Sequence, residues 1–223
     1  YFVVLGISFA QNNFPIVLIH GFMGWGPEEM GGYNYWGGVK DYVKKMEDEG
    51  YKVIEISVGP VSSNWERAVE AYYQLKGGQV DYGRAHSTKF NIIQKPKNAY
   101  FSGLYPEWDH DNPVHIVAHS MGGQTARMLD YLLTHEIYID EDSRIKENSV
   151  LLGETHNKMI KSITTISSPH DGTTLRDIVV KAIPFIQYFV GVAGVIGTNF
   201  YDFDLDHFHF IRDENESWSS YLS

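Results

Sequence analysis

Residues 113–123 of the chain read PVHIVAHSMGG. The part that ends at Ala118 is an apolar run rich in β-branched residues, which is typical of a buried strand. The part that follows places Ser120 among small residues, directly before a segment with apolar side chains at helical spacing. A serine on a tight strand-to-helix turn needs small neighbours such as Ala118 and Gly122, because other main-chain segments pass close to it. The stretch therefore predicts a nucleophile elbow with Ser120 as the nucleophile, and the alternative is an ordinary turn with an incidental serine.

A second apolar strand, at residues 15–19, ends in the sequence HGFMG at residues 20–24. A serine hydrolase needs two main-chain N–H groups that stabilise an oxyanion. One comes from the residue after the serine and one from an earlier junction of a strand and a loop. The sequence therefore predicts the amides of Met121 and Phe22 as the two donors. We expect His20 to be a hydrogen-bonded core histidine without a role in proton transfer.

Strands and helices alternate along the rest of the chain. Apolar periodicity predicts further strands at residues 52–58 and 161–167, and helices at residues 40–49, 64–74 and 124–133. A long polar excursion, rich in Tyr and Gly, follows the second helix and ends at residue 111. The alternation predicts an α/β fold, with a mostly parallel sheet, helices on both faces and a site at the carboxyl ends of the strands.

The composition agrees with a single enzyme domain. The chain has 223 residues, of which 43% are hydrophobic, so that it can build a sizeable core. The formal net charge of −10 argues against a nucleic-acid partner, because phosphate binding depends on clustered Lys and Arg. The absence of cysteine excludes disulfides, thiolate metal sites and a cysteine nucleophile.

Two apolar segments have several interpretations. Residues 1–13 are a remnant of a secretory signal peptide or an N-terminal extension, since residues 1–10 read YFVVLGISFA and end in a small-x-Ala pattern. Residues 178–196 are the most apolar part of the chain and fit a membrane span, a buried core helix or a lid over an apolar cleft. The polar interruptions Lys181 and Gln187 argue against a membrane span. The position of this apolar segment after a strand end favours a lid, around residues 175–200.

Four segments together resemble the secreted lipases of staphylococci and thermophilic bacilli. They are IVLIHGFMGW at 16–25, VGPVSSNW at 58–65, VAHSMGGQTARM at 117–128 and TTISSPHDGTTL at 164–175. The resemblance implies an α/β-hydrolase fold over residues 14–223 and a secreted, extracellular bacterial triacylglycerol lipase. Such an enzyme is a carboxylic ester hydrolase that acts on lipid at a lipid–water interface. A phospholipase and a general esterase are the alternatives within the enzyme class.

The resemblance also assigns the site. It matches Ser120 to the family nucleophile and Phe22 and Met121 to the oxyanion donors. In this family the catalytic acid and histidine follow the lid, together with the calcium ligands. The resemblance thus implies that these residues and the last strands of the sheet lie beyond residue 223, and that the sequence is C-terminally incomplete.

Two other outcomes stay open for the catalytic triad. The order serine, acid, histidine is also satisfied within the chain by Asp171 with His207 or His209. The alternative for Asp171 is a residue that caps its loop. From another functional class, the chain is a catalytically incomplete, lipase-like lipid-binding protein or fragment that docks on lipid through residues 178–196.

Serine ester hydrolysis needs no cofactor, but the resemblance implies zinc as well as calcium. Glu66 and His86 match the first acidic and the first histidine positions of the family zinc site. No second histidine is evident near Ile92, and two ligands do not close a zinc site. The alternative is a surface glutamate and an unrelated polar histidine.

Overall fold

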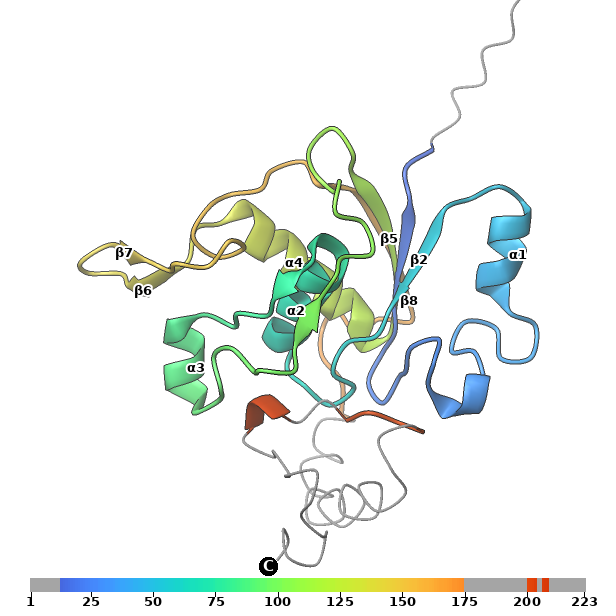
Figure 1. The fold of residues 1–223 in the computed structure, drawn as a ribbon, viewed down its shortest axis with the longest axis horizontal. Helices are drawn as coiled ribbons and strands as arrows, with labels where there is room; N and C mark the ends of the chain where they lie inside the picture. Colours follow the sequence, from blue (N-terminus) through green and yellow to red (C-terminus); the bar gives the residue numbers. More distant parts are fainter. Residues whose placement is uncertain (1–12, 175–199, 204–205, 209–223) are drawn as a thin grey trace, which may run out of the picture.

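The computed structural model describes residues 13–174, 200–203 and 206–208. Its centre is a four-stranded sheet in the order β2-β1-β5-β8, seen nearly edge-on in Figure 1. All three strand pairings are parallel. The strands are β1 (Ile16–Ile19), β2 (Val53–Ile56), β5 (Val114–His119) and β8 (Ile160–Ile166). Each of the four predicted strands is therefore present, with small differences at the ends.

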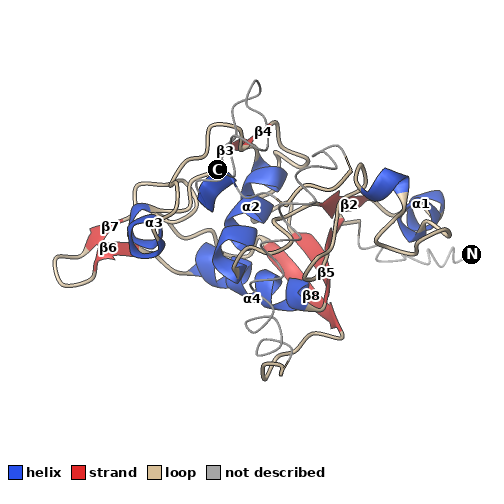
Figure 2. Ribbon diagram, turned by 90° about the horizontal axis from the view of Figure 1, so that it is seen from below, coloured by secondary structure: helices blue, strands red, loops and turns tan. Residues whose placement is uncertain are grey.

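Two helices lie side by side on one face of this sheet in both ribbon views (Figures 1 and 2). They are α2 (Asn64–Lys76) and α4 (Met121–Thr134), and α4 packs on β1, β5 and β8. The third predicted helix, α1 (Tyr42–Asp48), lies on the other side, beside β2 (Figure 1). The prediction of a mostly parallel sheet with helices on both faces is confirmed.

The core lies between the sheet and the helices α2 and α4. In β5, buried residues alternate with half-buried ones, as one face of a strand packs against the helices. Helix α2 is buried over ten consecutive positions and starts with a capping box, in which Ser63 and Glu66 bond to each other's main-chain N–H groups. The largest fully buried apolar side chains are Leu18, Ile19, Ile56, Leu75, Tyr82, Trp108, Ile116, Leu129, Leu132, Leu133 and Leu151.

The polar excursion between α2 and β5 contains short elements that periodicity did not predict. This region contains α3 (Arg84–Phe90) and a short antiparallel pair, β3 (Gly78–Gln79) with β4 (Tyr100–Phe101). Strands of two residues carry no readable periodicity, and the first turn of α3 is held by a distant residue, since the Ala85 N–H donates to Glu147 at 2.7 Å. The remaining short elements, which periodicity did not predict, are η1 (Met30–Gly32), β6 (Tyr138–Asp140), β7 (Ile145–Lys146) and η2 (Asp206–Phe208).

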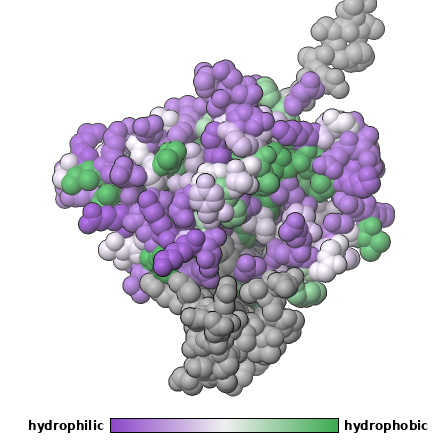
Figure 3. All heavy atoms as spheres, in the orientation of Figure 1, coloured by the Kyte–Doolittle hydropathy of each residue, from purple (hydrophilic) through white to green (hydrophobic). Residues whose placement is uncertain are grey.

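Two predicted segments lie outside the described residues. These are the N-terminal segment, apart from residue 13, and residues 175–199, which include the predicted lid. Among the helices of residues 13–174 and 206–208, none has the length and apolar character that a membrane span requires. The face of the molecule seen in Figure 3 is mostly hydrophilic, with apolar side chains in small scattered groups.

Candidate active site

Ser120 lies at the sharp turn between β5 and α4, at the carboxyl end of the parallel sheet. Its main-chain angles are φ 53° and ψ −125°, a conformation that residues with a side chain rarely adopt. The turn is held by the Ser120 N–H, which donates to the Ile166 carbonyl in β8 at 2.8 Å. Such strain persists only where the surrounding structure imposes it, and it is typical of functional sites.

Two glycines let the end of β1 approach this turn. A Cβ on Gly21 would lie 2.8 Å from the Cβ of Ser120, and a Cβ on Gly122 would lie 2.7 Å from the His20 carbonyl oxygen. Both distances are too short for real side chains, so the close contact of the two main chains requires glycine. Gly122 of the predicted elbow therefore has the steric role that the sequence assigns to it.

Phe22 and Met121, the predicted oxyanion donors, both lie next to residues of this close contact. Phe22 follows Gly21, which abuts the serine, and Met121 is the first residue of α4. Within the described residues, neither N–H donates to another protein atom. Two unpaired amides beside one hydroxyl are the geometry that an oxyanion hole needs.

Tyr35 is a site residue that periodicity did not predict. Its hydroxyl accepts the Gly21 N–H at 2.9 Å and lies 2.5 Å from Nδ1 of His119. Because the hydroxyl oxygen is the acceptor for Gly21, its own proton is free to be donated to His119. Trp25 packs edge-on against the Tyr35 ring at 5.1 Å between centroids. The only sequence signal for this role is the richness of residues 31–38 in Gly and aromatic residues.

His20 is the hydrogen-bonded core histidine that the sequence predicts. Its Nε2 accepts the Val58 N–H at 3.1 Å, so Nδ1 carries the proton and donates it to the Gly21 carbonyl at 2.9 Å. Burial, together with the positive charge of Arg67, lowers the pKa of His20 to about 3. The ring is therefore neutral near pH 7, with both nitrogens occupied.

Of the internal triad candidates, the two described residues Asp171 and His207 make no hydrogen bond to Ser120. Asp171 is exposed, and His209 lies outside the described residues. His207 is buried, with its ring 5.0 Å from the ring of Tyr82, and burial lowers its pKa to about 4. Within the part of the chain that the structure describes, no side chain hydrogen-bonds to the Ser120 hydroxyl.

Glu66 and His86 are in direct contact. His86 Nε2 lies 2.5 Å from Glu66 Oε1, and Trp65 stacks on the imidazole with 4.8 Å between ring centroids. Burial raises the pKa of Glu66, but hydrogen bonds from His86 and Ser63 outweigh burial and hold that pKa below its usual value. The alternative of a surface glutamate is wrong, because Glu66 is only 3% exposed.

This pair has the donor chemistry of a zinc site, a carboxylate and an imidazole. A zinc ion would take the place of the hydrogen bond that joins them. Across residues 13–174, 200–203 and 206–208, no group of three or more His, Asp or Glu side chains is placed to hold a metal ion. The described residues thus fit two ligands of such a site.

A strained serine between a strand and a helix, at the carboxyl end of a parallel sheet, is typical of the α/β-hydrolase class. The family described as "Lipase-like, C-terminal domain" matches residues 12–223, and the chain belongs to this family. It is 37% identical over 222 residues to a lipase of Staphylococcus epidermidis and 39% identical over 220 residues to a lipase of Staphylococcus hyicus. These alignments cover 95% of this chain but 32% and 34% of the relatives, so the chain spans about a third of their length.

Solved structures show the same similarity. The crystal structure of Staphylococcus hyicus lipase superposes with a TM-score of 0.82 at 37% identity, over 95% of this chain and 56% of that one. The structure of EstA from Clostridium botulinum gives a TM-score of 0.79 at 43% identity, over 95% and 50% of the two chains. The family resemblance inferred from the four sequence segments is confirmed.

Proposed function

We propose that the protein to which these residues belong hydrolyses carboxylic esters of lipids as a triacylglycerol lipase, with Ser120 as its nucleophile. The observation that carries the proposal is the strained Ser120 turn with the unpaired amides of Phe22 and Met121 beside it. The relatives named lipase support the same reaction class. A neutral substrate also suits a chain with a formal net charge of −10.

In the proposed reaction, the Ser120 oxygen attacks the ester carbonyl carbon while a histidine general base takes the hydroxyl proton. The carbonyl oxygen becomes an oxyanion, which the Phe22 and Met121 amides stabilise. The intermediate collapses, and the alcohol leaves with the proton from the histidine. Water then cleaves the acyl-serine ester by the same steps and releases the carboxylic acid and free Ser120.

The family resemblance assigns the histidine general base and the acid that orients it to positions beyond residue 223. Asp171 with His207 or His209 is the alternative within the chain. Acyl-chain and head-group preference depends on the packing around residues 175–200, so phospholipids and soluble esters are alternative substrates.

The chemistry needs no cofactor, and we propose zinc as a structural ion. It would bind Glu66 and His86, with its other ligands outside the described residues, and calcium would bind entirely outside them. Zinc content after dialysis, measured by mass spectrometry for the wild type and for Glu66→Gln, tests this assignment. Equal zinc in both proteins would contradict it.

We also propose that the protein is secreted by a bacterium and meets its substrate at a lipid–water interface. The support is the resemblance to secreted lipases, with the small-x-Ala pattern near residue 10. Recovery of the protein from the culture medium of its native host tests secretion. Its retention inside the cells would count against this location.

Turnover by the full-length product of the gene tests the proposed function. Triacylglycerol emulsion, phosphatidylcholine and a short-chain nitrophenyl ester serve as substrates. We expect triacylglycerol to be hydrolysed and Ser120→Ala to lower kcat by about 10⁶, the loss that follows removal of a serine nucleophile. A serine-directed phosphonate should label Ser120. Exposed Ser102 supplies the control Ser102→Ala, which should keep wild-type kcat.

Each other outcome contradicts a separate part of the proposal. Lipid binding without turnover or labelling identifies a non-catalytic lipid-binding protein. Faster hydrolysis of phosphatidylcholine identifies a phospholipase. If a polypeptide of residues 1–223 matches the rate of the full-length product, the triad lies within the chain, and Asp171 with His207 or His209 replaces the proposed partners.

A further inference from the structure

Arg67 in α2 is completely buried, with 0% exposure. A buried guanidinium is costly unless its N–H groups find acceptors. Its Nη2 donates to the His20 carbonyl at 2.5 Å, and its Nη1 donates to the Gly59 carbonyl at 2.7 Å. Its Nε donates to the Thr125 hydroxyl at 2.9 Å. One side chain thus joins the end of β1, the loop after β2 and the first turns of α4.

The first of these hydrogen-bonded branches, to the His20 carbonyl, holds the peptide group between His20 and Gly21. The next peptide group along the chain carries the N–H of Phe22, the predicted oxyanion donor. The His20 carbonyl accepts from Arg67, and the Gly21 N–H of the same peptide group donates to the Tyr35 hydroxyl at 2.9 Å. This peptide cannot rotate without breaking one of these hydrogen bonds, and a buried group without a partner is costly.

The second branch holds the residue that follows Phe22. The Gly59 carbonyl accepts from Arg67, while the Gly59 N–H donates to Glu70 at 2.6 Å. The next residue, Pro60, accepts the N–H of Met23 at 2.9 Å. The loop after β2 is therefore held by Arg67 and Glu70 of α2. Through Pro60 it in turn holds residues 21–24, the predicted oxyanion loop.

The third branch reaches the residue after the nucleophile. The Thr125 hydroxyl accepts from Arg67 and lies 3.2 Å from the Met121 carbonyl and 3.4 Å from Asn64 Oδ1, to either of which it can donate. Helices α2 and α4 lie side by side in both ribbon views, so this contact links them at the end nearest the nucleophile (Figures 1 and 2).

We propose that Arg67 is a positioning residue whose guanidinium sets the relative placement of the Phe22 and Met121 amides. The inference rests on the proposed function, because it assigns Arg67 to that reaction. Three acceptors in different directions match the planar fork of arginine, which a lysine ammonium does not reproduce. Glu70 lies one turn further along α2, where its carboxyl oxygens accept from the Gly59 N–H and the Tyr82 hydroxyl.

The kinetic test compares Arg67→Met, Arg67→Lys and Thr125→Val with the exposed control Arg84→Met. In the full-length gene product, Arg67→Met should lower kcat for a short-chain ester about 100-fold with little change in KM, because oxyanion contacts act in the transition state. Arg67→Lys should restore only part of this loss. Thr125→Val, which removes the branch to α4 alone, should lower kcat about tenfold. Arg84→Met should keep the wild-type kcat.

Hydrogen exchange of the full-length gene product gives a readout that needs no catalysis. In Arg67→Met, the hydrogen-bonded amides of Gly21, Met23 and Gly24 should exchange at least about tenfold faster, while those of β5 keep wild-type rates. If the amides of β5 exchange faster by the same factor, the variant has lost stability in general and the positioning role is overturned. Unchanged exchange rates together with an unchanged kcat also overturn it. If Arg67→Met does not fold, an unchanged kcat in Thr125→Val overturns the proposal.

These outcomes separate the failure of the inference from the failure of the proposed function. A wild-type protein that a serine-directed phosphonate does not label contradicts the function, whereas the exchange rates of residues 21–24 still decide whether Arg67 holds the loop. A labelled, active wild type whose Arg67→Met variant keeps both kcat and exchange rates contradicts the role of Arg67 alone.

Discussion

His20 uses both nitrogens of its ring to fix the main chain at the end of β1, and burial makes this contact sensitive to pH. Its pKa is about 3 in the folded protein, against an ordinary value of 6.5. Between these values the unfolded chain takes up a proton that the folded protein excludes. The contribution of His20 to stability is therefore fully present above pH 6.5 and is lost as the pH falls toward about 3.

We expect the free energy of unfolding to fall with decreasing pH in this window, with about 1.4 kcal/mol per pH unit from each such histidine. His207, whose pKa is about 4, adds to the slope above that pH. His20→Gln keeps an acceptor for the Val58 N–H but does not titrate, so urea unfolding from pH 7 to 4 should show a shallower slope. The exposed control His110→Gln should keep the wild-type slope. The same slope in His20→Gln and wild type would contradict this account.

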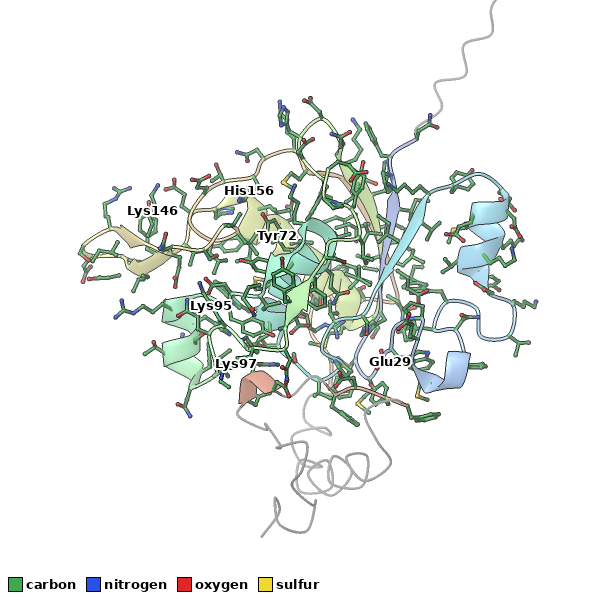
Figure 4. All side chains as sticks on the ribbon, viewed as in Figure 1. Glu29, Tyr72, Lys95, Lys97, Lys146 and His156 are labelled. Carbon is green, nitrogen blue, oxygen red and sulfur yellow. The ribbon has the colours of Figure 1, made fainter. Side chains whose placement is uncertain are left out.

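At the scale of elements, Glu29 joins three segments beside the oxyanion loop. Its Oε2 accepts from the Gly26 N–H at 2.7 Å and from the Ser57 hydroxyl at 2.8 Å, and its Oε1 accepts the Asp202 N–H at 2.8 Å. Figure 4 shows Glu29 close to η1, below the sheet. The carboxylate thus ties the loop before η1 to the end of β2 and to residues 200–203.

Glu29→Gln should weaken this junction, because an NH₂ group replaces one carboxylate oxygen. This group cannot accept from the N–H or O–H donors that it would face. We expect the free energy of unfolding to fall by about 1–3 kcal/mol, as for a lost hydrogen bond to a charged group. The amides of residues 24–30 should exchange faster with solvent. The neighbouring exposed residue supplies a matched control, Glu28→Gln, which should change neither quantity. Equal stability of the two variants would show that the junction is dispensable.

At the scale of the whole molecule, the charge determines which surfaces attract the protein. The formal net charge is −10 at pH 7, and the face seen in Figure 3 is mostly hydrophilic. At low salt, we expect stronger adsorption to phosphatidylcholine vesicles than to phosphatidylglycerol vesicles, because like charges repel. Salt at about 1 M should remove the difference, since it screens charges beyond about 3 Å. Preferential sedimentation with the anionic vesicles at low salt would contradict this expectation.

The elements that the sequence predicted are those with long or strongly patterned apolar runs. The four strands of the sheet and the helices α1, α2 and α4 belong to this group. Helix α4 begins at Met121, three residues before its predicted start, because the apolar spacing starts later than the main-chain turn. The short elements α3, β3 and β4 were not predicted, because contacts with distant residues stabilise them. Strands β6 and β7 pair with each other across a short turn, but at three and two residues they are too short to show a periodicity.

The sequence by itself determined the tight turn at Ser120 and the glycine-rich end of β1, since the steric demand of a tight turn is local and is met by small residues at fixed positions. Only the tertiary structure decided that Arg67 and Tyr35 hold the end of β1 beside this turn and that Glu29 joins Gly26 to Ser57 and Asp202. Arg67 and the His20 carbonyl are 47 residues apart in the chain, and Tyr35 and His119 are 84 residues apart. Burial and hydrogen-bond partners over such separations arise from packing, which no local pattern encodes.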